Sequence, residues 1–438
     1  MTNSVVTKNY NILVAKQMKE SVSEDADTKI YCCFGRVSAW DDEDNPDQAN
    51  TSYVSQNDMW NAMVGGKRVF ENDIEHVIAR KNWTSGVVYN QYDDRDVDLF
   101  SRDFYVLTTD YRVYKCLSNN SNTLSTIEPT SEIVNNTTQT SDGYIWKFMY
   151  SLNSEDKYRF TNSEYFPVKE LTTDNGSLQW DIQEAAVDGK INSIFIEDSG
   201  NYTTDNLTIT ITGDGSGANA YATVNVSSNV VSNVTIDNTG SGYTYATATI
   251  TGGGGTGGGS LYVPIPPSGG HGSDALRELG GSNLMVNIAI RGTESGTLPI
   301  VNNFRRIALM AEPYAYGTSN VYTNTTFTST TDLTLTGVSS NFTEDEIVYQ
   351  GSSLEGSTFK GTVVEWNSAN SNLKLNNTEG TTLSSVLVGD TSGSVAFVAS
   401  VETPDIANKT GQVLYIDNIE EIKRNEFQTE NFRIVLKY

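Results

Sequence analysis

The chain has few of the residues on which most enzymes and secreted proteins depend. It holds two histidines and three cysteines among 438 residues. Neither His76 nor His271 has neighbours at the spacing of a zinc site or a nucleophile relay, so we expect structural roles for both. Cys32 and Cys33 are adjacent and the count is odd, which argues against a disulfide framework and favours folding in a reducing compartment.

Long apolar runs and positive charge are also scarce. No segment approaches the ~18 apolar residues of a membrane helix, and we expect no signal peptide. The 29 basic residues stand against 54 acidic ones, giving a formal net charge of −25. A surface this acidic repels phosphate backbones and anionic lipid heads. We therefore expect neither nucleic acid nor a membrane as a partner. The cysteine content and the lack of a signal peptide predict synthesis in a cytoplasm.

Acidic and glycine-rich segments need separate consideration as ligand sites. Residues 41–44 and 93–96 are rich in carboxylates, but the first lacks the glycine of a calcium-binding loop, which favours solvated loops. Residues 252–259 lack the Gly-Lys-Ser/Thr ending of a phosphate loop and are interpreted as a turn. We expect no metal ion, no cofactor and no catalytic residue. A hydrolase that uses paired carboxylates remains an alternative, because the sequence does not single out a pair.

What the chain has in abundance favours strands joined by turns. Glycine occurs 36 times and tyrosine 23 times, and aromatic and β-branched residues suit pleated sheets whereas glycine suits turns. Helices are predicted over residues 11–21 and over a segment with Asp58 as its N-cap that ends at residues 65–66. Strands are predicted over residues 29–34, 104–107, 112–117, 144–152, 284–290, 306–310, 413–416 and 432–436.

Two stretches are rich in Gly, Thr, Ser and Asn. The first contains an internal repeat, in which residues 194–213 and 234–252 each read as strand, glycine turn with Tyr-Thr, strand and glycine tail. We predict two similar hairpins that pack together, because one hairpin cannot bury a face alone. In the second stretch, residues 320–403, short strands at even spacing predict a small barrel or sandwich.

These changes of composition predict an α+β fold, predominantly β, in which a discontinuous sheet-rich core is interrupted by two β modules. The core comprises residues 1–175, 280–315 and 405–438. Residues 176–279 form an inserted β-hairpin repeat domain, and residues 316–404 form an inserted small β-barrel or sandwich domain. Such inserts are tolerated at surface loops.

Aromatic and charged motifs recur in order along the predicted core. Most of its tryptophans are expected in core packing, and some as interface anchors, because Trp, Tyr and Arg dominate binding hot spots. The motifs are residues 33–36 with Trp40, 57–60, 77–83, 111–117, 127–129, 142–148, 162–165, 303–307, 411–416 and 432–436. As an ordered set they resemble the baseplate wedge subunit of contractile-tailed phages that dimerises in the outer part of the wedge. The signature and candidate interface residues are Phe34, Gly35, Arg36, Trp40, Asp58, Trp60, Trp83, Tyr144 and Trp146.

The resemblance implies a sheet-dominated structural subunit of the virion tail baseplate. It implies a homodimer that binds other baseplate wedge proteins, and it implies no catalysis. It skips both inserts, which resemble β modules in virion proteins of marine phages, so a cyanophage-like virus is the expected source. A carbohydrate- or receptor-binding tail protein that uses the inserts is the alternative function.

Overall fold

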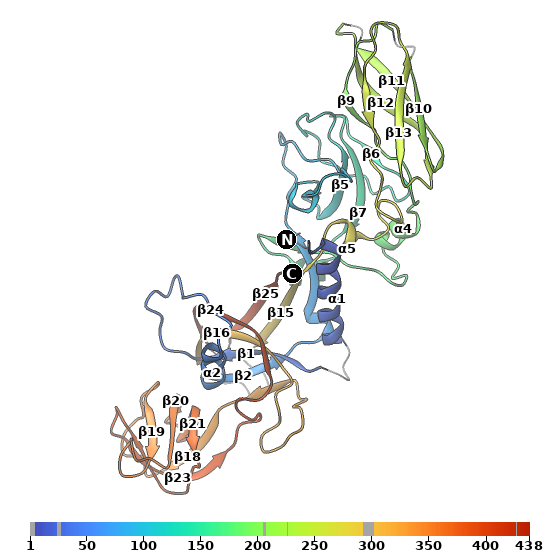
Figure 1. Ribbon diagram of the computed structural model, residues 1–438. Coiled ribbons are helices and arrows are strands. Elements are labelled where there is room, and N and C mark those ends of the chain that lie inside the picture. The colour runs from blue at the N-terminus through green and yellow to red at the C-terminus, as the bar shows by residue number, and fades with distance from the viewer. Residues whose placement is uncertain (1–4, 24–27, 205–206, 226, 292–301, 426) are drawn as a thin grey trace, which may run out of the picture. The chain divides into compact units, whose positions relative to one another are not determined.

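A computed structural model describes residues 5–23, 28–204, 207–225, 227–291, 302–425 and 427–438 (Figure 1). Strands predominate, which confirms the predicted β-rich fold class. The chain divides into two compact units. Unit 1 consists of Met1–Lys16, Glu75–Met285 and Val435–Tyr438, and unit 2 consists of Gln17–Ile74 and Val286–Ile434. Among the described helices, none has the length and apolar character needed to cross a membrane.

Unit 1 is built around a four-stranded sheet with the order β4-β5-β7-β6. Its strands β5 and β7 were predicted and pair antiparallel, and the five central residues of each are buried. The core beside this sheet includes Phe104, Leu107 and Phe166. The elements here are β3 (Ile74–Ala79), β4 (Tyr105–Leu107), β5 (Arg112–Ser118), β6 (Thr138–Gln139), β7 (Ile145–Ser151), α3 (Ser154–Phe160), β8 (Tyr165–Pro167), α4 (Leu178–Glu184) and α5 (Ala275–Glu278).

The glycine-rich repeat forms a six-stranded sheet with the order β12-β11-β10-β13-β14-β9. Its strands are β9 (Phe195–Asp198), β10 (Leu207–Gly213), β11 (Ser216–Asn225), β12 (Val230–Ser241), β13 (Ala246–Gly252) and β14 (Ser260–Tyr262). The predicted pair of hairpins is wrong. The second strands of the two repeats, β10 and β13, pair with each other, while β12 pairs β11 and β9 pairs β14. The first strand of each repeat therefore pairs with the strand that follows the other repeat in the sequence.

This pairing gives the sheet an internal two-fold symmetry. The tyrosines of the two repeats follow the same symmetry. Tyr202 and Tyr243 occupy equivalent positions, and both are buried in the module's core. The Tyr202 hydroxyl accepts a hydrogen bond from the Gly259 N–H at 3.1 Å, and the Tyr243 hydroxyl accepts one from the Ala218 N–H at 3.3 Å. The repeat therefore encodes one shared core, because neither copy has enough apolar residues to bury its own sheet face.

Unit 2 contains a five-stranded sheet with the order β17-β2-β1-β16-β24. Strand β1 lies at its centre, pairs antiparallel with both neighbours and is buried along its full length. The strands are β1 (Ile30–Gly35), β2 (Met63–Arg68), β16 (Asn302–Ala311), β17 (Thr326–Thr328) and β24 (Gln412–Arg424). Strands β15 (Asn283–Arg291) and β25 (Thr429–Leu436) and helix α1 (Lys8–Ser23) complete the predicted elements of the core.

The second Thr-rich stretch forms a closed barrel, which confirms the barrel alternative of the prediction. Its core includes Leu333, Val363 and Leu375. The strands close in the order β18-β21-β20-β19-β22-β23. They are β18 (Thr331–Thr336), β19 (Ile347–Gln350), β20 (Phe359–Asn367), β21 (Asn372–Gly380), β22 (Val386–Gly389) and β23 (Val395–Glu402).

Helix α2 (Tyr53–Ala62) corrects the prediction that Asp58 is an N-cap. The cap is Ser52, whose side chain accepts a hydrogen bond from the Ser55 N–H, and Asp58 lies exposed inside the helix. Gly65 and Gly66, which were predicted to end the helix, belong to β2. A Cβ atom at Gly66 would lie 2.5 Å from the Phe327 ring, so this glycine makes room for packing between strands and does not end the helix.

The three cysteines are buried and free, as the argument against a disulfide framework predicted. The division into a discontinuous core and two inserted domains stays a prediction. Two segments near the predicted ends of the first insert pack on the sheet of unit 1. Ile182 of α4 joins the cluster around Trp146, and Leu276 of α5 joins the cluster around Phe104.

Candidate interface residues and a polar cleft

The nine signature residues do not form one cluster. Six of them, from Phe34 to Trp60, lie in unit 2, and the other three, Trp83, Tyr144 and Trp146, lie in unit 1. Each group therefore has to be described by its own contacts.

Arg36 follows β1 and joins the central sheet of unit 2 to the barrel. Its Nε donates to Asp345 Oδ1 at 2.9 Å, and its Nη2 donates to Glu344 Oε2 at 3.0 Å. Its Nη1 donates to the Val364 carbonyl oxygen at 3.2 Å. The Arg36 side chain is 5% exposed, whereas Glu344 and Asp345 are 57% and 67% exposed. Burial works to lower the pKa of Arg36, but the hydrogen bonds to the two carboxylates outweigh it and raise the pKa.

Phe34 and Gly35 pack the end of β1 against its neighbours. The Phe34 ring lies 5.2 Å from the Phe304 ring and 5.4 Å from the Phe432 ring, centroid to centroid. A Cβ atom at Gly35 would lie 3.4 Å from the end of the Met59 side chain, so α2 packs directly on the strand here. Both signature residues are buried and hold the core together.

Trp40 begins the acidic segment and is half-buried. Its Nε1 donates to the Ile419 carbonyl oxygen at 2.9 Å. Its backbone N–H donates to Glu43 Oε1, which also accepts a hydrogen bond from Arg305 Nε at 2.8 Å. The carboxylate of Glu43 is thus engaged by a guanidinium group, and the Arg306 guanidinium lies over the Trp40 ring, 5.8 Å from its centroid.

The first turn of helix α2 is exposed and apolar. Tyr53 and Val54 are 83% and 68% exposed, the highest values among large apolar side chains of the helix. Trp60, at the other end, is half-buried and donates from Nε1 to the Thr410 carbonyl oxygen at 3.2 Å. Tyr53 and Val54 were missed in the sequence, because two apolar residues at the start of a helix resemble the start of a core-facing stripe.

The three signature residues of unit 1 belong to an aromatic core. Tyr144 stacks on Trp146 with ring centroids 5.4 Å apart and an interplanar angle of 15°, and both are 0% exposed. Trp83 is partly buried and donates from Nε1 to Ser125 Oγ at 3.1 Å. These positions agree with the core-packing interpretation of the tryptophans, and the interface role of the signature residues stays a prediction.

A fully buried ion pair in unit 1 was not foreseen. Lys115 Nζ lies 2.8 Å from Glu278 Oε2 and 3.0 Å from His271 Nδ1, and both charged side chains are 0% exposed. The Tyr92 ring covers the ammonium group, with its centroid 4.1 Å from Nζ. Glu278 Oε1 accepts the backbone N–H of Gly272 at 2.7 Å. The pair ties β5 to the segment that leads out of the glycine-rich module.

The protonation of this group follows from burial and charge. Burial, followed by repulsion from Lys115, lowers the pKa of His271 to about 4. Burial works to raise the pKa of Glu278, but attraction by Lys115 outweighs it and lowers the pKa to about 2. The sequence held one signal, a lysine in the middle of the apolar run 113–117, because an unpaired buried charge is costly. The partners of Lys115 are distant in sequence, so the sequence held no signal of the pairing itself.

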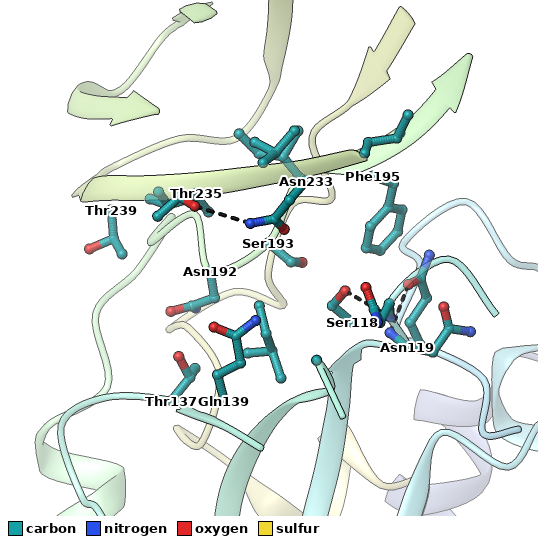
Figure 2. Close-up of a pocket in the computed structure, with 18 of the residues that line it drawn as sticks. Ser118, Asn119, Thr137, Gln139, Asn192, Ser193, Phe195, Asn233, Thr235 and Thr239 are labelled. Carbon is teal, nitrogen blue, oxygen red and sulfur yellow. Dashed lines mark hydrogen bonds between the residues drawn. The ribbon is translucent and has the colours of Figure 1, made fainter. Parts of the chain in front are cut away.

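A polar cleft of about 580 Å³ lies in unit 1 between the β5–β7 sheet and strand β12 of the glycine-rich module. Figure 2 shows Ser118, Asn119 and Gln139 facing Asn192 and Thr235 across it. Ten of its lining residues are asparagine or glutamine, and two are charged, namely Lys190 and Asp237. The volume lies in the range of ligand pockets, but the lining is much more polar than usual.

One wall of the cleft is a loop in an unusual backbone conformation. Asn120, Ser121 and Asn122 have φ values of 52°, 58° and 64° in succession. This left-handed region costs free energy for residues other than glycine, although asparagine adopts it more readily than most, and such residues cluster at functional sites. Asn119 fixes the loop, since its Nδ2 donates to the Tyr89 carbonyl oxygen at 3.0 Å and to Asn122 Oδ1 at 2.9 Å.

Carboxylates of both acidic segments, residues 41–44 and 93–96, form ion pairs with arginine side chains of the chain. In the second segment Asp93 pairs with Arg95 at 3.0 Å, and Asp96 pairs with Arg102 at 3.1 Å. Within the described part of the chain, no three His, Cys, Asp or Glu side chains gather in a way that would hold a metal ion.

The comparison with known families finds one similarity, in the N-terminal part of the chain. Residues 4–120 match the model of a family described as bacteriophage T4 Gp8. This range contains Phe34 to Trp60, Trp83 and Lys115. No curated protein matches the chain significantly. The match gives no support for a cyanophage origin, which stays a prediction. Residues 4–120 of the 438-residue chain are thus similar to the Gp8 family, a family of phage baseplate wedge proteins.

Proposed function

We propose that this chain is a non-enzymatic wedge subunit that forms a homodimer and binds neighbouring wedge proteins during tail assembly. The family match over residues 4–120 is the observation that carries the proposal. The described residues add a suitable contact surface within that range.

The contact surface that we propose consists of Trp40, Tyr53 and Val54. Trp40 has a fixed indole group that is half-buried, and Tyr53 and Val54 are strongly exposed. Large aromatic side chains that are already held in place lose little conformational entropy on binding, and they dominate the energetics of protein interfaces. We propose that the acidic residues 41–44, which follow Trp40 in the chain, form its polar rim, as is usual around the centre of an interface.

Sedimentation of the purified chain tests the proposal. We expect a dimer, and we expect the double variant Tyr53→Ser/Val54→Ser to lose either the dimer or the binding of neighbouring wedge proteins. Tyr245→Ser is the matched control, because Tyr245 is 61% exposed in the glycine-rich module, outside residues 4–120. A monomeric chain that binds no wedge protein would refute the proposal, and a double variant that behaves like the control would refute this surface.

A further inference from the structure

The polar cleft of unit 1 has a chemical character that the wedge function does not require. The chain as a whole is strongly acidic, yet the cleft is lined mainly by neutral amides and hydroxyls. Its charged lining residues are one lysine and one aspartate. A ligand with net charge would lose its hydration here without gaining an excess of opposite charge, which is unfavourable.

Carboxamide side chains are matched to hydroxyl groups. Each carboxamide offers two N–H donors and a carbonyl acceptor, and each hydroxyl group both donates and accepts. A ligand with many neighbouring hydroxyl groups can therefore bond to several carboxamides at once. Two walls of such groups, from the β5–β7 sheet and from β12, face each other across the cleft (Figure 2).

The cleft combines fixed and available carboxamides. Asn119 and Asn120 are fixed by hydrogen bonds, the latter from its Nδ2 to the Asp142 carbonyl oxygen at 3.1 Å. Asn136 and Gln139 are exposed, and their side chains make no hydrogen bond to any described residue. The available pair therefore has its full bonding capacity for a ligand, while the fixed pair keeps the opposite loop in shape.

An apolar strip lies along the module side of the cleft. Phe195 and Ile196 of β9 belong to the lining, and Figure 2 shows the Phe195 ring between the strand and the loop at Ser118 and Asn119. Phe195 is 8% exposed, so it offers the cleft a small apolar patch. Sugar rings have apolar C–H faces as well as hydroxyl groups, so a polar cleft with an apolar strip fits them better than it fits a purely polar ion.

From these observations we propose that the cleft binds a neutral oligosaccharide. The hydroxyl groups would bond to Asn136, Gln139 and the facing amides, and C–H groups would contact Phe195. An extended peptide is the competing ligand, because β12 is an edge strand of its sheet. The side chains favour the sugar, since both walls present amides and hydroxyls, whereas strand addition relies on one backbone edge.

The test uses the full-length chain on an array of neutral, sulfated and sialylated glycans, followed by calorimetric titration with the neutral glycan that is retained most strongly. We expect retention of neutral glycans, and at least tenfold weaker binding by Asn136→Ala/Gln139→Ala. Gln48→Ala is the matched control, because Gln48 is exposed and lies outside the cleft lining. Melting temperature and sedimentation of the double variant should equal those of the parent chain.

Three results would overturn the proposal. The first is that no neutral glycan is retained, or that only sulfated or sialylated glycans are. The second is that the double variant binds as tightly as the control. The third is that an extended peptide library is retained at the cleft in place of glycans. None of these results would bear on dimerisation, which is measured separately.

Discussion

Two cations from the family-matched segment make comparable contacts in the two units. Arg36 binds the barrel of unit 2 through Asp345 and Glu344, and Lys115 binds Glu278 in unit 1. The environments differ, since the carboxylates facing Arg36 are mostly exposed whereas both members of the Lys115 pair are 0% exposed. Water can solvate the first set if the contact breaks, but it cannot reach the second.

This difference decides what each contact contributes. Exposed carboxylates gain little from pairing, because water and salt screen them. A buried pair gains little over an apolar core as a whole, yet loss of one partner leaves a charge without solvent or counterion. We therefore expect the Lys115 pair to tolerate no single substitution, and the Arg36 contact to be weaker and reversible.

The largest effect is expected from Glu278→Gln. The variant leaves the Lys115 ammonium group buried without its counterion, which costs about 3–5 kcal/mol. Urea unfolding measures this loss of unfolding free energy. Hydrogen exchange of the β5 amides shows whether the loss lies in unit 1. Glu379→Gln is the matched control, because Glu379 pairs with Lys360 on the surface, where pairs contribute about 0–1 kcal/mol. Equal losses in the two variants would remove the distinction between buried and exposed pairs.

A smaller effect is expected from Arg36→Met. The side chain keeps its apolar contacts but loses the hydrogen bonds to Asp345, Glu344 and the Val364 carbonyl, a loss of about 1.5–3 kcal/mol. Hydrogen exchange should accelerate in β20, because Arg36 Nη1 donates to the Val364 carbonyl oxygen of that strand at 3.2 Å. Unchanged exchange there would show that Arg36 does not hold the barrel. Arg112→Met, with exposed partners, serves as the control.

A further expected effect is a dependence of the stability of unit 1 on pH. The pKa of His271 is lowered from 6.5 to about 4, so between these values the unfolded chain binds a proton that the folded chain does not. The free energy of unfolding should therefore rise with pH from about 4 to 6.5, and fall away on acidification. His271→Gln should flatten this part of the profile, measured by urea midpoints. An unchanged slope in the variant would assign the pH dependence to other groups.

Local patterns in the sequence were enough to predict most strands of both units. The runs that became β1, β5 and β7 have apolar residues at positions that bury a sheet face, and a single segment carries that information. The pairing of the repeat was not predictable in this way. The predicted hairpins assume that the two strands of one repeat pair with each other. Instead, β10 pairs β13 of the other repeat, while β9 and β12 pair β14 and β11, which lie outside the repeated segments.

The candidate site was likewise predictable from the sequence only in part. Arg36 and Trp40 were identified by family motifs, but their partners Asp345 and Ile419 lie more than 300 residues away in the sequence. The cleft was missed altogether, because its amides come from loops and strands that fold together only in three dimensions. Single asparagines in a chain rich in asparagine are indistinguishable from turn residues.

Assembly is the central claim, and reconstitution tests it most directly. The full-length chain is mixed with the other proteins of the baseplate wedge, and the products are separated by sedimentation velocity. The account predicts that two copies enter each wedge complex, and that Tyr53→Ser/Val54→Ser reduces their entry. A chain that sediments alone, while the remaining wedge proteins assemble to completion without it, would contradict the account.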